Sequence, residues 1–499
     1  MSKLHLRLLG LLAGLTLCFA PNPAFCQTTF GSIVGTVTDS SGGAVPQAVV
    51  KLTNLGTSEI RNGITSSDGL YQFVNLLPGS YCVDVEKPAF KTATRALITV
   101  QVQNTVKIDF TLEVGSTSQT VEVTEETPLL QPETSSLGQV VSQVEVNTLP
   151  LNGRNAMNLT ALAPSVVPQG QTSGTVTGTN QYSYGNYQIG GGMANESAAF
   201  LDGQPLNIVY QNIVSLIPAQ DSLQEFKVQT NSLPPEYGRL AGGVINFSTK
   251  SGSNQLHGGG WEFLRNKVLN GNNVFSNEQG LATPPFTQNQ FGADIGGPVY
   301  IPHIYDGRNK TFFFFDYEGF WLRQGETFVT TVPTPQQRAG DFSSTYLPSG
   351  VLDAIYDPNT STPAPGNPGQ YARTQFPNNM IPLSRFSPAS LQLMNLFPLP
   401  NASGTALTAT NNWVGNSSIG GDNNQYVGRV DQNVSDKQHI FGRFTYFKDF
   451  DLPTDPFGNG VCLDRCSDRV INNSIVLHDI YTLSPTTVLD ISPSVVRRK

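Results

Sequence analysis

The sequence predicts a mostly β protein made of several successive units. Charged residues make up only 13% of the chain, whereas glycine (48 residues) and proline (34 residues) are frequent. Short runs that alternate apolar and polar residues recur along the chain and are separated by Gly, Pro, Asp and Asn, a pattern typical of half-buried strands joined by turns. A length of 499 residues is too great for one ordinary domain and predicts about three units.

The charge balance and the rare side chains exclude several function classes. The chain has 29 basic and 37 acidic residues, a net charge of −8, and its one basic run is Arg497, Arg498 and Lys499 at the C-terminus. A nucleic-acid partner is therefore not expected, since binding needs a basic face. The four histidines beyond residue 26 have no HExxH or comparable spacing. No nucleophile stands near a base in a supporting context either, so we expect no metal, no cofactor and no enzyme activity.

Residues 1–26 have the pattern of a secretory signal peptide. Lys3 and Arg7 precede an apolar stretch from Leu8 to Ala20, and cleavage is expected before Gln27. That stretch is too short to cross about 30 Å of hydrocarbon as a helix, which argues against a membrane anchor. Later stretches are less apolar still, so any membrane crossing must be made by strands. An exported chain of this kind resides in the periplasm, in the outer membrane or outside the cell.

Residues 28–114 predict a β-sandwich. Ile33, Gly35 and Val37 share one face of a first strand, and turn residues recur every eight to twelve positions. The runs GTVTDSSGGAVPQAVV and SDGLYQFVNLLPGSY resemble a carboxypeptidase regulatory-like domain, which implies a non-catalytic accessory sandwich. Three aromatic residues could form a carbohydrate platform, although packing in the core or at turns is favoured. These residues are Tyr71, Phe73 and Tyr81.

Residues 116–250 begin with a polar linker that contains the short Val-rich run QTVEVT. This run resembles a TonB box, the strand with which TonB-dependent receptors pair to their energising partner by β-augmentation. The last strand of the sandwich or the first strand of the next unit is an equally good interpretation, since the two valines suit any short strand. The candidate TonB box consists of Gln119, Thr120, Val121, Glu122, Val123 and Thr124.

The rest of this segment carries four ordered sequence blocks. LPLNGRN leads into an Asn-capped helix expected from about Ala156 to Ala163, and a glycine-rich loop is expected from Gly170 to Gly192. The blocks LPLNGRN, FLDG, LQEFKVQTN and EYGRLAGGVINFSTK together resemble the α+β plug domain of TonB-dependent receptors. The plug motif residues are Asn152, Gly153, Arg154, Asp202, Gly203, Tyr237, Gly238, Gly242, Gly243 and Asn246.

Three of these glycines precede an expected strand over residues 244–249. Gly238, Gly242 and Gly243 predict either positive φ or a close backbone approach where the plug packs against a barrel wall. A bulge in a soluble sheet would explain a lone pair of glycines as well, and the neighbouring blocks favour the plug.

Residues 251–499 contain seven strand candidates of about the length that a tilted transmembrane strand requires. In QHIFGRFTYFK, Ile440, Gly442, Phe444 and Tyr446 alternate with His439, Phe441, Arg443 and Thr445. One face is apolar and the other is mixed, as expected for a strand with lipid outside and a polar lumen inside. The seven candidates are HGGGWEFLRN, NQFGADIGGPVYI, KTFFFFDYEGFWLRQ, NNQYVGRVDQNVS, QHIFGRFTYFKDF, NNSIVLHDIYTLS and TVLDISPSVVRR.

The connections between these candidates alternate between long and short. Long ones follow Asn266 and run over about 332–423 and 452–470, and short ones lie near residues 306–309, 435–437 and 485–486. Outer-membrane barrels have long extracellular loops and short periplasmic turns, so the alternation predicts orientation as well as fold. A soluble jelly roll or sandwich would not require such regularity. Cys462 and Cys466 lie four apart in one of the long loops, which favours a disulfide over a metal site.

The blocks NQFGADIGGPVYI, KTFFFFDYEG and PTPQQRAGDFS resemble the Oar-like subgroup of TonB-dependent receptors. The resemblance implies an outer-membrane transporter of the Gram-negative type, with the plug in an antiparallel transmembrane β-barrel and the sandwich in the periplasm. Barrels of that family have about 22 strands, and seven strands cannot close a barrel. We therefore expect residues 251–499 to form a partial barrel of a truncated or partial gene product.

The function that this resemblance implies is plug-gated active transport, by uptake or export, of a bulky solute. The cargo could be a carbohydrate, an iron chelate or a secreted protein, and the expected partners are TonB and outer-membrane lipid. The alternative is a secreted or surface-bound carbohydrate-binding or adhesive β-sandwich protein. Extraction from membranes only by detergent distinguishes the transporter from that alternative.

Overall fold

The computed structural model describes most of the chain beyond residue 29. The described residues are 30–115, 120–122, 136–149, 151–168, 187–208, 212, 214–234, 237, 238, 240–272, 274, 277, 283–366, 369–463, 466, 467, 469–484 and 487–499. The expected signal peptide and most of the expected glycine-rich loop lie outside these residues. Within them the prediction of a mostly β protein is confirmed.

Residues 30–115 and the short strand β9 form two facing sheets, here called the sandwich. One sheet contains β1 (Gly31–Asp39), β4 (Leu70–Leu76), β7 (Thr105–Lys107) and β8 (Phe110–Leu112). The other has the order β3 (Ile60–Ile64), β2 (Val49–Asn54), β5 (Gly79–Glu86), β6 (Thr92–Val100) and β9 (Thr120–Glu122). Ile33 and Val37 are fully buried between the sheets, which confirms the predicted inward face of the first strand.

The three aromatic residues of the sandwich lie in its core. Tyr71, Phe73 and Tyr81 are 5%, 7% and 4% exposed and belong to one apolar cluster. The Tyr71 hydroxyl donates a hydrogen bond to the Ile108 carbonyl at 2.7 Å, which satisfies its polar end. Packing is therefore the role of these rings, and a carbohydrate platform built from them is wrong because their faces are covered.

Residues 136–250 form a second unit, here called the middle unit. Its sheet has the order β10 (Leu137–Val141), β15 (Leu223–Asn231), β16 (Val244–Thr249), β13 (Ala198–Leu201) and β14 (Gln204–Pro205). Its other elements are α2 (Gln143–Thr148), η1 (Asn152–Arg154), η2 (Ala156–Leu162), β11 (Val166–Pro168), β12 (Tyr187–Ile189), η4 (Ala194–Glu196) and η5 (Gln220–Ser222).

The predicted helix of the middle unit is present as a 3-10 helix. The Asn155 side chain accepts a hydrogen bond from the Met157 N–H, as expected for a cap, and η2 ends at Leu162, two residues before Pro164. The strand predicted after the glycines is β16, in which all six residues are buried.

Residues 257–498 form an antiparallel sheet, here called the wall. Its order is β17 (His257–Asn266), β18 (Phe286–Pro298), β21 (Thr311–Thr330), β24 (Trp413–Ser435), β25 (Gln438–Asp451), β26 (Arg469–Ser484) and then β27 (Thr487–Ile491) with β28 (Ser494–Arg498). β27 and β28 lie end to end along β26. All seven predicted strands are thus present. β21 and β24 extend beyond their predicted ends, so the longest connection is 331–412 rather than 332–423.

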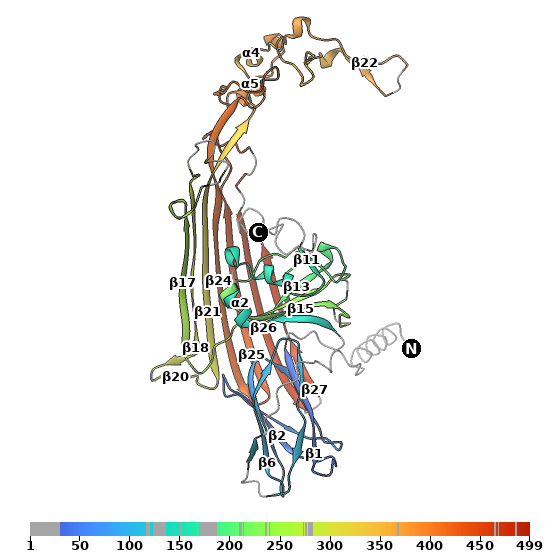
Figure 1. The fold of residues 1–499 in the computed structure, drawn as a ribbon, viewed down its shortest axis with the longest axis vertical. Coiled ribbons are helices and arrows are strands. Elements are labelled where there is room, and N and C mark those ends of the chain that lie inside the picture. The colour runs from blue at the N-terminus through green and yellow to red at the C-terminus, as the bar shows by residue number, and fades with distance from the viewer. Residues whose placement is uncertain are drawn as a thin grey trace, which may run out of the picture.

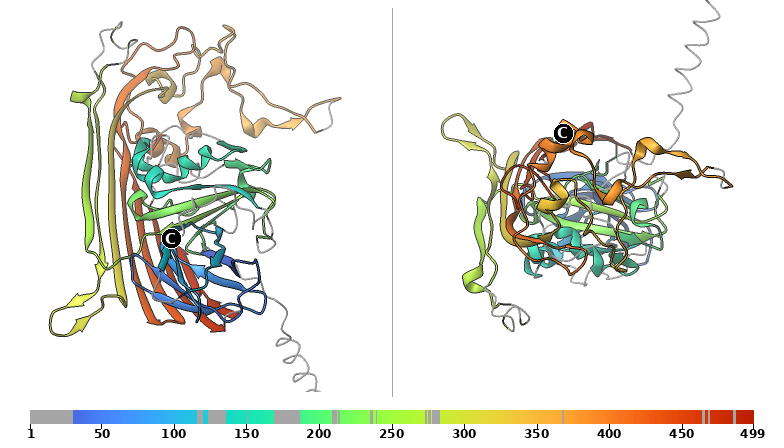
Figure 2. Two further views of the ribbon diagram at one scale, coloured as in Figure 1. Left: turned by 60° about the horizontal axis from the view of Figure 1, so that its bottom comes forward. Right: turned by 90° about the horizontal axis from the view of Figure 1, so that it is seen from above.

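The two faces of the wall differ as predicted. In β25, the residues from His439 to Asp451 that alternate with Ile440, Phe444 and Tyr446 are buried, whereas the outward residues are partly or fully exposed. Figures 1 and 2 show why: the wall curves around one side of the middle unit, which covers its concave face. Lipid is the expected environment of the apolar convex face.

The connections of the wall carry small elements of their own. The small elements in the connections are η6 (Lys267–Leu269), β19 (Tyr300–Ile301), β20 (Tyr305–Asp306), α4 (Pro335–Arg338), η7 (Pro358–Thr360), β22 (Thr362–Pro363), β23 (Tyr371–Ala372), η8 (Pro377–Asn379), η9 (Leu383–Arg385) and α5 (Pro388–Met394). Among the described residues, no helix combines the length and the hydrophobicity needed to span a bilayer.

The sandwich lies beneath the middle unit, at the end of the wall where the short connections are (Figures 1 and 2). Phe30 packs in an apolar cluster with Phe441, Val476 and Ile480 of the wall. The Asn75 amide donates a hydrogen bond to Asp490 at 3.1 Å. The middle unit in turn completes its core with Phe447 of β25, so all three units share buried contacts.

Candidate functional site between the middle unit and the wall

Arg154, a predicted plug residue, binds the wall through charge and through aromatic rings. Gly153 before it has φ 72°, which turns the chain so that the Arg154 side chain faces β17 and β21. Its guanidinium pairs with Asp221 of the middle unit, and its Nε lies 3.5 Å from Oε2 of Glu318. The guanidinium carbon also lies 5.3 Å and 5.0 Å from the ring centroids of Trp261 and Phe263. Arg154 therefore joins the two units.

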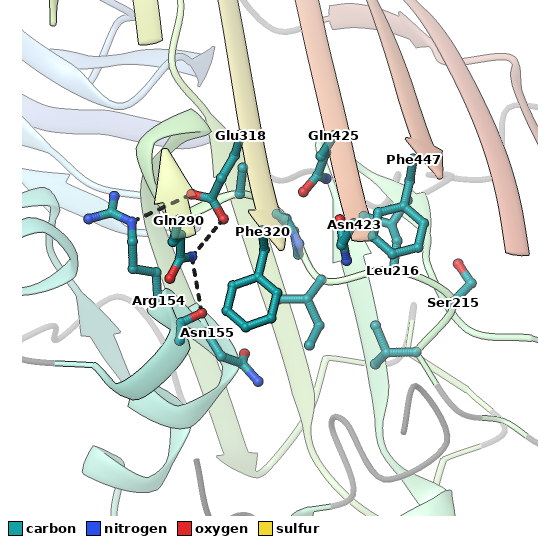
Figure 3. Close-up of a pocket in the computed structure, with 15 residues that line it drawn as sticks. Arg154, Asn155, Ser215, Leu216, Gln290, Glu318, Phe320, Asn423, Gln425 and Phe447 are labelled. Atoms are coloured by element: carbon teal, nitrogen blue, oxygen red, sulfur yellow. Dashed lines mark hydrogen bonds and ion pairs between the residues drawn. The ribbon is translucent and has the colours of Figure 1, made fainter. Parts of the chain in front are cut away.

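A cavity of about 50 Å³ lies beside this contact (Figure 3). Gln290 bridges its edge, since its amide donates to the Gly153 carbonyl at 3.3 Å and to Glu318 at 3.1 Å. A space of this size holds one or a few water molecules, whereas sites for organic ligands measure about 300 to 1,000 Å³. The cavity is lined by residues 153–155 and 214–219 of the middle unit and by Gln290, Glu318, Phe320, Asn423, Gln425 and Phe447 of the wall.

Asp202, the second charged residue of the predicted plug motif, lies in the turn between β13 and β14. Asp202 and Gly203 both have positive φ, 49° and 81°, which the FLDG block accommodates with a glycine. Thr249 donates to the Asp202 carboxylate from its backbone N–H at 2.9 Å and from its hydroxyl at 2.8 Å. Asp202 is only 3% exposed, so its charge requires a partner.

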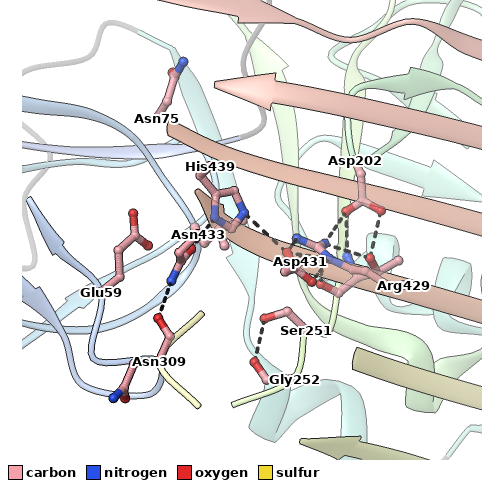
Figure 4. A network of polar contacts seen from close by, with 12 residues as sticks. Glu59, Asn75, Asp202, Ser251, Gly252, Asn309, Arg429, Asp431, Asn433 and His439 are labelled. Carbon is pink, nitrogen blue, oxygen red and sulfur yellow. Dashed lines mark hydrogen bonds and ion pairs between the residues drawn. The ribbon is translucent and has the colours of Figure 1, made fainter. Parts of the chain in front are cut away.

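Two arginines of the wall supply that partner (Figure 4 shows Arg429). Nε of Arg443 lies 2.8 Å from Oδ2 of Asp202, and Nη1 of Arg429 lies 3.5 Å from Oδ1. Arg443 also donates to the Leu201 carbonyl at 3.1 Å, and Arg429 pairs with Asp431 at 2.8 Å. Both arginine side chains are at most 1% exposed, so the ion pairs are enclosed between the two units.

Two further polar residues of the plug motif, Tyr237 and Asn246, face the sandwich instead of the wall. The side chain of Asn152 lies outside the described part of the chain. Asn246 donates to the side-chain oxygen of Gln103 at 2.8 Å, and the Gln103 amide donates to the Tyr237 hydroxyl. Gln103 lies in the loop between β6 and β7, with φ 51°. The loop 101–104, here called the docking loop, thus binds the middle unit at Tyr237 and at β16.

Two charged residues of β15 are buried under the docking loop. Glu225 accepts a hydrogen bond from the Val102 N–H, and Lys227 donates to the Gln103 carbonyl at 2.8 Å. Glu225 is 7% exposed and Lys227 is 1% exposed. Burial raises the pKa of Glu225 to about 7, against the opposing effects of the Val102 N–H and Lys227. Burial lowers the pKa of Lys227 to about 8, against the opposing effect of Glu225.

The glycines before β16 have a different role from the predicted one. A Cβ on Gly243 would lie 2.1 Å from Cγ2 of Ile189, and one on Gly242 would lie 2.5 Å from Oγ of Ser197. The predicted close approach is therefore present, but it is made within the middle unit and not against the wall. Gly238 is exposed, has open space around it and needs no positive φ, so its predicted role is wrong.

Half of the candidate TonB box is described. Thr120, Val121 and Glu122 form β9, which pairs in parallel with Thr92, Ala93 and Thr94 of β6 at the edge of the sandwich. Gln119, Val123 and Thr124 lie outside the described residues. The segment thus occupies the place of a last sandwich strand, one of the interpretations that the sequence left open.

Cys462 and Cys466 are joined by a disulfide, with 5.3 Å between their Cα atoms, in the long connection between β25 and β26. In the part of the chain that the structure describes, His, Cys, Asp and Glu form no group of three or more that could hold a metal ion. The alternation within β25 predicted Arg443 on the inward face of its strand, whereas Arg429 was not predicted as a site residue. Each is an arginine at an inward position of an otherwise amphipathic strand, which is the signal that could have identified both.

The wall is a curved sheet with an apolar convex face and charged residues on its concave face, and the middle unit packs against the concave face. This combination is typical of an outer-membrane β-barrel protein. The sequence model of the outer membrane beta barrel domain matches residues 248–499, half of the chain, and the chain belongs to this family. The carboxypeptidase regulatory-like domain matches residues 32–113. Proteins of this barrel family reside in the outer membrane.

The chain is also similar to the TonB-dependent transporter Oar of Myxococcus xanthus, with 27% identity over 289 residues. The match covers 55% of this chain and 26% of that protein, so the chain spans about a quarter of its relative's length. Among solved structures, the outer membrane transporter YddB from Escherichia coli matches with a TM-score of 0.40 and 11% identity over 72% of this chain and 38% of that chain. A variant of the ferric enterobactin receptor PfeA from Pseudomonas aeruginosa matches with a TM-score of 0.35 and 10% identity over 69% of this chain and 38% of that chain.

Proposed function

We propose that this chain works in TonB-dependent transport across the outer membrane, with the middle unit as the plug. The observation that carries the proposal is the enclosed ion pairing of Asp202 with Arg429 and Arg443. Removing one partner from a buried ion pair costs about 3 to 5 kcal/mol, so such pairs hold an inner unit firmly in one position. They can also exchange partners when the inner unit moves, which is what a gate needs.

The small size of the cavity beside Arg154 supports a gate that opens only when the middle unit moves. A cavity of about 50 Å³ beside Arg154 cannot pass a bulky solute while the middle unit stays in place. The cargo is therefore a solute that enters only after the contacts of Arg154 or Asp202 are broken. A carbohydrate, an iron chelate and a secreted protein all remain within this class, and the relative Oar supports the transporter class alone.

The orientation follows from the connections. Long connections, such as 331–412, face the cell exterior in outer-membrane barrels, and short ones, such as 436–437, face the periplasm. The sandwich lies at the short-connection end (Figure 1), which supports a periplasmic position for it. Residues 119–124 are then on the side from which TonB acts. As an edge strand, β9 offers backbone groups for pairing with a strand of TonB.

Site-directed cross-linking tests this proposal. Single cysteines are introduced at each position from Gln119 to Thr124 in a full chain with Cys82→Ser, expressed together with TonB that carries a cysteine in its pairing strand. We expect disulfide cross-links at alternate positions, because a paired strand turns alternate side chains to the same face. Matched cysteines at Leu137 and Gln139 of β10 should not cross-link.

Two outcomes would contradict the proposal. One is recovery of the chain as a water-soluble protein without detergent, which would favour the secreted carbohydrate-binding or adhesive alternative. The other is equal cross-linking of β10 and of residues 119–124, which would show that TonB does not select this segment.

A further inference from the structure

A continuous chain of polar contacts runs from the sandwich into the wall. At the sandwich, the Gly56 carbonyl accepts a hydrogen bond from the Asn254 N–H at 3.0 Å. The Asn254 side-chain oxygen accepts from the Asn309 N–H at 2.8 Å, and the Asn309 carbonyl accepts from the Asn433 amide at 3.4 Å. The Asn433 side-chain oxygen then lies 2.7 Å from Nδ1 of His439. The sandwich is thus connected to a histidine of the wall.

The same histidine continues the chain to the ion pairs of the middle unit. Nε2 of His439 lies 3.4 Å from Oδ1 of Asp431, which binds the Arg429 guanidinium through contacts of 2.8 Å and 2.9 Å. Nη1 of that guanidinium faces Asp202 and lies 3.5 Å from its Oδ1. Figure 4 shows this part of the chain, from Asn309 to Asp202. His439 therefore lies between the sandwich and the charges that hold the middle unit.

Both ring nitrogens of His439 face hydrogen-bond acceptors. On one side the Asn433 amide nitrogen donates to the Asn309 carbonyl, so the Asn433 oxygen must point at the ring. On the other side the acceptor is the Asp431 carboxylate. A neutral imidazole has one N–H and can satisfy only one of these acceptors, whereas the protonated ring has two. The geometry therefore matches the protonated ring.

The surroundings of His439 provide negative charge for that proton. The ring is 3% exposed, and β26 places the apolar Ile480 directly opposite it. From the sandwich, Glu59 faces the ring together with its ion-pair partner Arg61. Burial raises the pKa of Glu59, but the nearby charges of Arg61 and His439 outweigh burial and keep this pKa below its usual value. A proton on the ring thus meets two carboxylates, Asp431 from the wall and Glu59 from the sandwich.

We propose that His439 is a pH-sensitive link that couples docking of the sandwich to the hold on the middle unit. When the proton leaves, one ring nitrogen presents a lone pair to an acceptor, so the contact with Asn433 or with Asp431 becomes repulsive. Loss of the first contact breaks the chain toward the sandwich, and loss of the second disturbs the carboxylate that positions Arg429. Histidine changes its charge between about pH 5 and pH 8 more readily than other side chains. Acid therefore holds both units in place, and a rise in pH loosens them.

The consequence for gating rests on the proposed role of the middle unit as a plug. The test needs neither TonB nor a transported solute, so the two proposals can fail separately. Nuclear magnetic resonance of the chain with isotope-labelled histidine, in detergent, reports the charge of the ring. For His439 we expect two protonated ring nitrogens at about pH 6 and one at about pH 8, and His439→Gln identifies the signals because they are then missing. A ring with the same number of protons at both pH values would overturn the proposal.

A cysteine at the contact between the middle unit and the wall reports the hold on the middle unit. Ser215 is 3% exposed, and its hydroxyl accepts from the Asn472 amide at 3.2 Å. In a chain with Cys82→Ser, the thiol of Ser215→Cys is therefore labelled only when the middle unit moves, and mass spectrometry of its peptide measures the rate. We expect His439→Gln to speed labelling about tenfold at pH 6, because a charged hydrogen bond is lost, but less than about twofold at pH 8. Comparing the two chains at the same pH cancels the pH dependence of the thiol itself.

Coupling to the sandwich is tested by cutting the chain of contacts at its other end. Asn254→Ala should speed labelling of Ser215→Cys about threefold at pH 6, but it should add nothing in a chain that already carries His439→Gln. Additive effects of the two changes would show that the sandwich does not act through His439, which overturns the coupling.

His478→Gln is the matched control. His478 is also buried in the wall and paired with a carboxylate, but its partner Asp490 binds Asn75 of the sandwich. This change should leave labelling of Ser215→Cys within about twofold at both pH values. Equal acceleration by the two histidine variants would overturn the proposal, as would an effect of His439→Gln that is the same at pH 6 and pH 8.

Discussion

Arg443 of the wall and Asp202 of the middle unit form an ion pair whose closest atoms, Nε and Oδ2, are 2.8 Å apart. Neither side chain has more than 3% of its surface exposed. The two residues are 241 positions apart in the sequence, yet the pair lies where β25 passes the turn between β13 and β14. The attachment of the middle unit to the wall depends on such enclosed charges.

Replacing Arg443 with methionine should destabilise this attachment strongly. The change leaves Asp202 buried with one arginine in place of two, and breaking a buried pair typically costs about 3 to 5 kcal/mol. Chemical denaturation of the full chain in detergent measures the free energy of unfolding. Arg323→Met is the matched control, because its ion pair with Asp422 is exposed and should contribute about 1 kcal/mol or less. Equal losses in the two variants would show that burial does not set the strength of the Asp202 contact.

Stability should pass through a minimum between about pH 7 and pH 8. The pKa of Glu225 is raised from 4.5 to about 7 in the folded chain, so its contribution is greatest below pH 4.5 and is lost as the pH rises through 7. The pKa of Lys227 is lowered from 10.5 to about 8, so its contribution is present above pH 10.5 and is lost as the pH falls through 8. The slope of each limb is at most about 1.4 kcal/mol per pH unit.

Thermal unfolding of Glu225→Gln in detergent tests the acidic limb. The variant should show a smaller fall in stability between pH 5 and pH 7 than the unaltered chain shows. Glu113→Gln should keep that fall, because Glu113 pairs with Lys91 on the exposed surface of the sandwich. A Glu225→Gln profile that is parallel to that of the unaltered chain would exclude Glu225 as the titrating group.

Removing the Gln103 side chain should loosen the sandwich from the middle unit. Gln103→Gly keeps the positive φ but loses the hydrogen bonds to Asn246 and Tyr237, each worth about 1 kcal/mol. Hydrogen exchange should become faster in β15 and β16, which the docking loop covers. Gln47→Gly is the control, since Gln47 also lies in the sandwich with positive φ, 53°. If both variants or neither speeds exchange in these strands, the docking loop does not protect the middle unit.

Gly243→Ala should destabilise the middle unit. The new methyl group would lie 2.1 Å from Ile189 and 2.5 Å from the Gln229 carbonyl, so the backbone of two strands must separate, at a cost of about 1 to 3 kcal/mol. Gly238→Ala should be neutral, because nothing lies within 4 Å of the added atom. Denaturation midpoints of both variants check this. A neutral Gly243→Ala would mean that the strands adjust without strain.

Sequence alone predicted the strands of the wall better than the contacts made by its inner face. The bounds of β17 agree with the prediction, and the strand ends at Asn266, whose side chain caps the following 3-10 helix η6. β21 and β24 were predicted too short because their ends toward the long connection, such as Gly325 to Thr330, lack apolar alternation. Those residues are held by pairing with each other, as Thr330 with Trp413, which a pattern within one strand does not reveal.

The contacts of the candidate site could likewise not be predicted from patterns within one strand. Alternation placed Arg443 on the inward face, but nothing local indicates that its partner is Asp202 or that Arg429 joins them. The glycines of EYGRLAGGVINF correctly predicted crowding at Gly242 and Gly243 but not its source. The crowding comes from Ile189 and Ser197, which lie outside this motif and approach the glycines only in the folded chain. Pairing across distant segments is decided by the fold.

Phe447 lies on a strand of the wall and is 5% exposed, yet it belongs to the apolar core of the middle unit. The core of the middle unit is therefore completed only when a much later strand has arrived. During export, the middle unit lacks this ring while β25 is still being delivered. Periplasmic chaperones that shield apolar surface should for that reason engage this stretch longer than they engage the sandwich, whose core is drawn from its own residues.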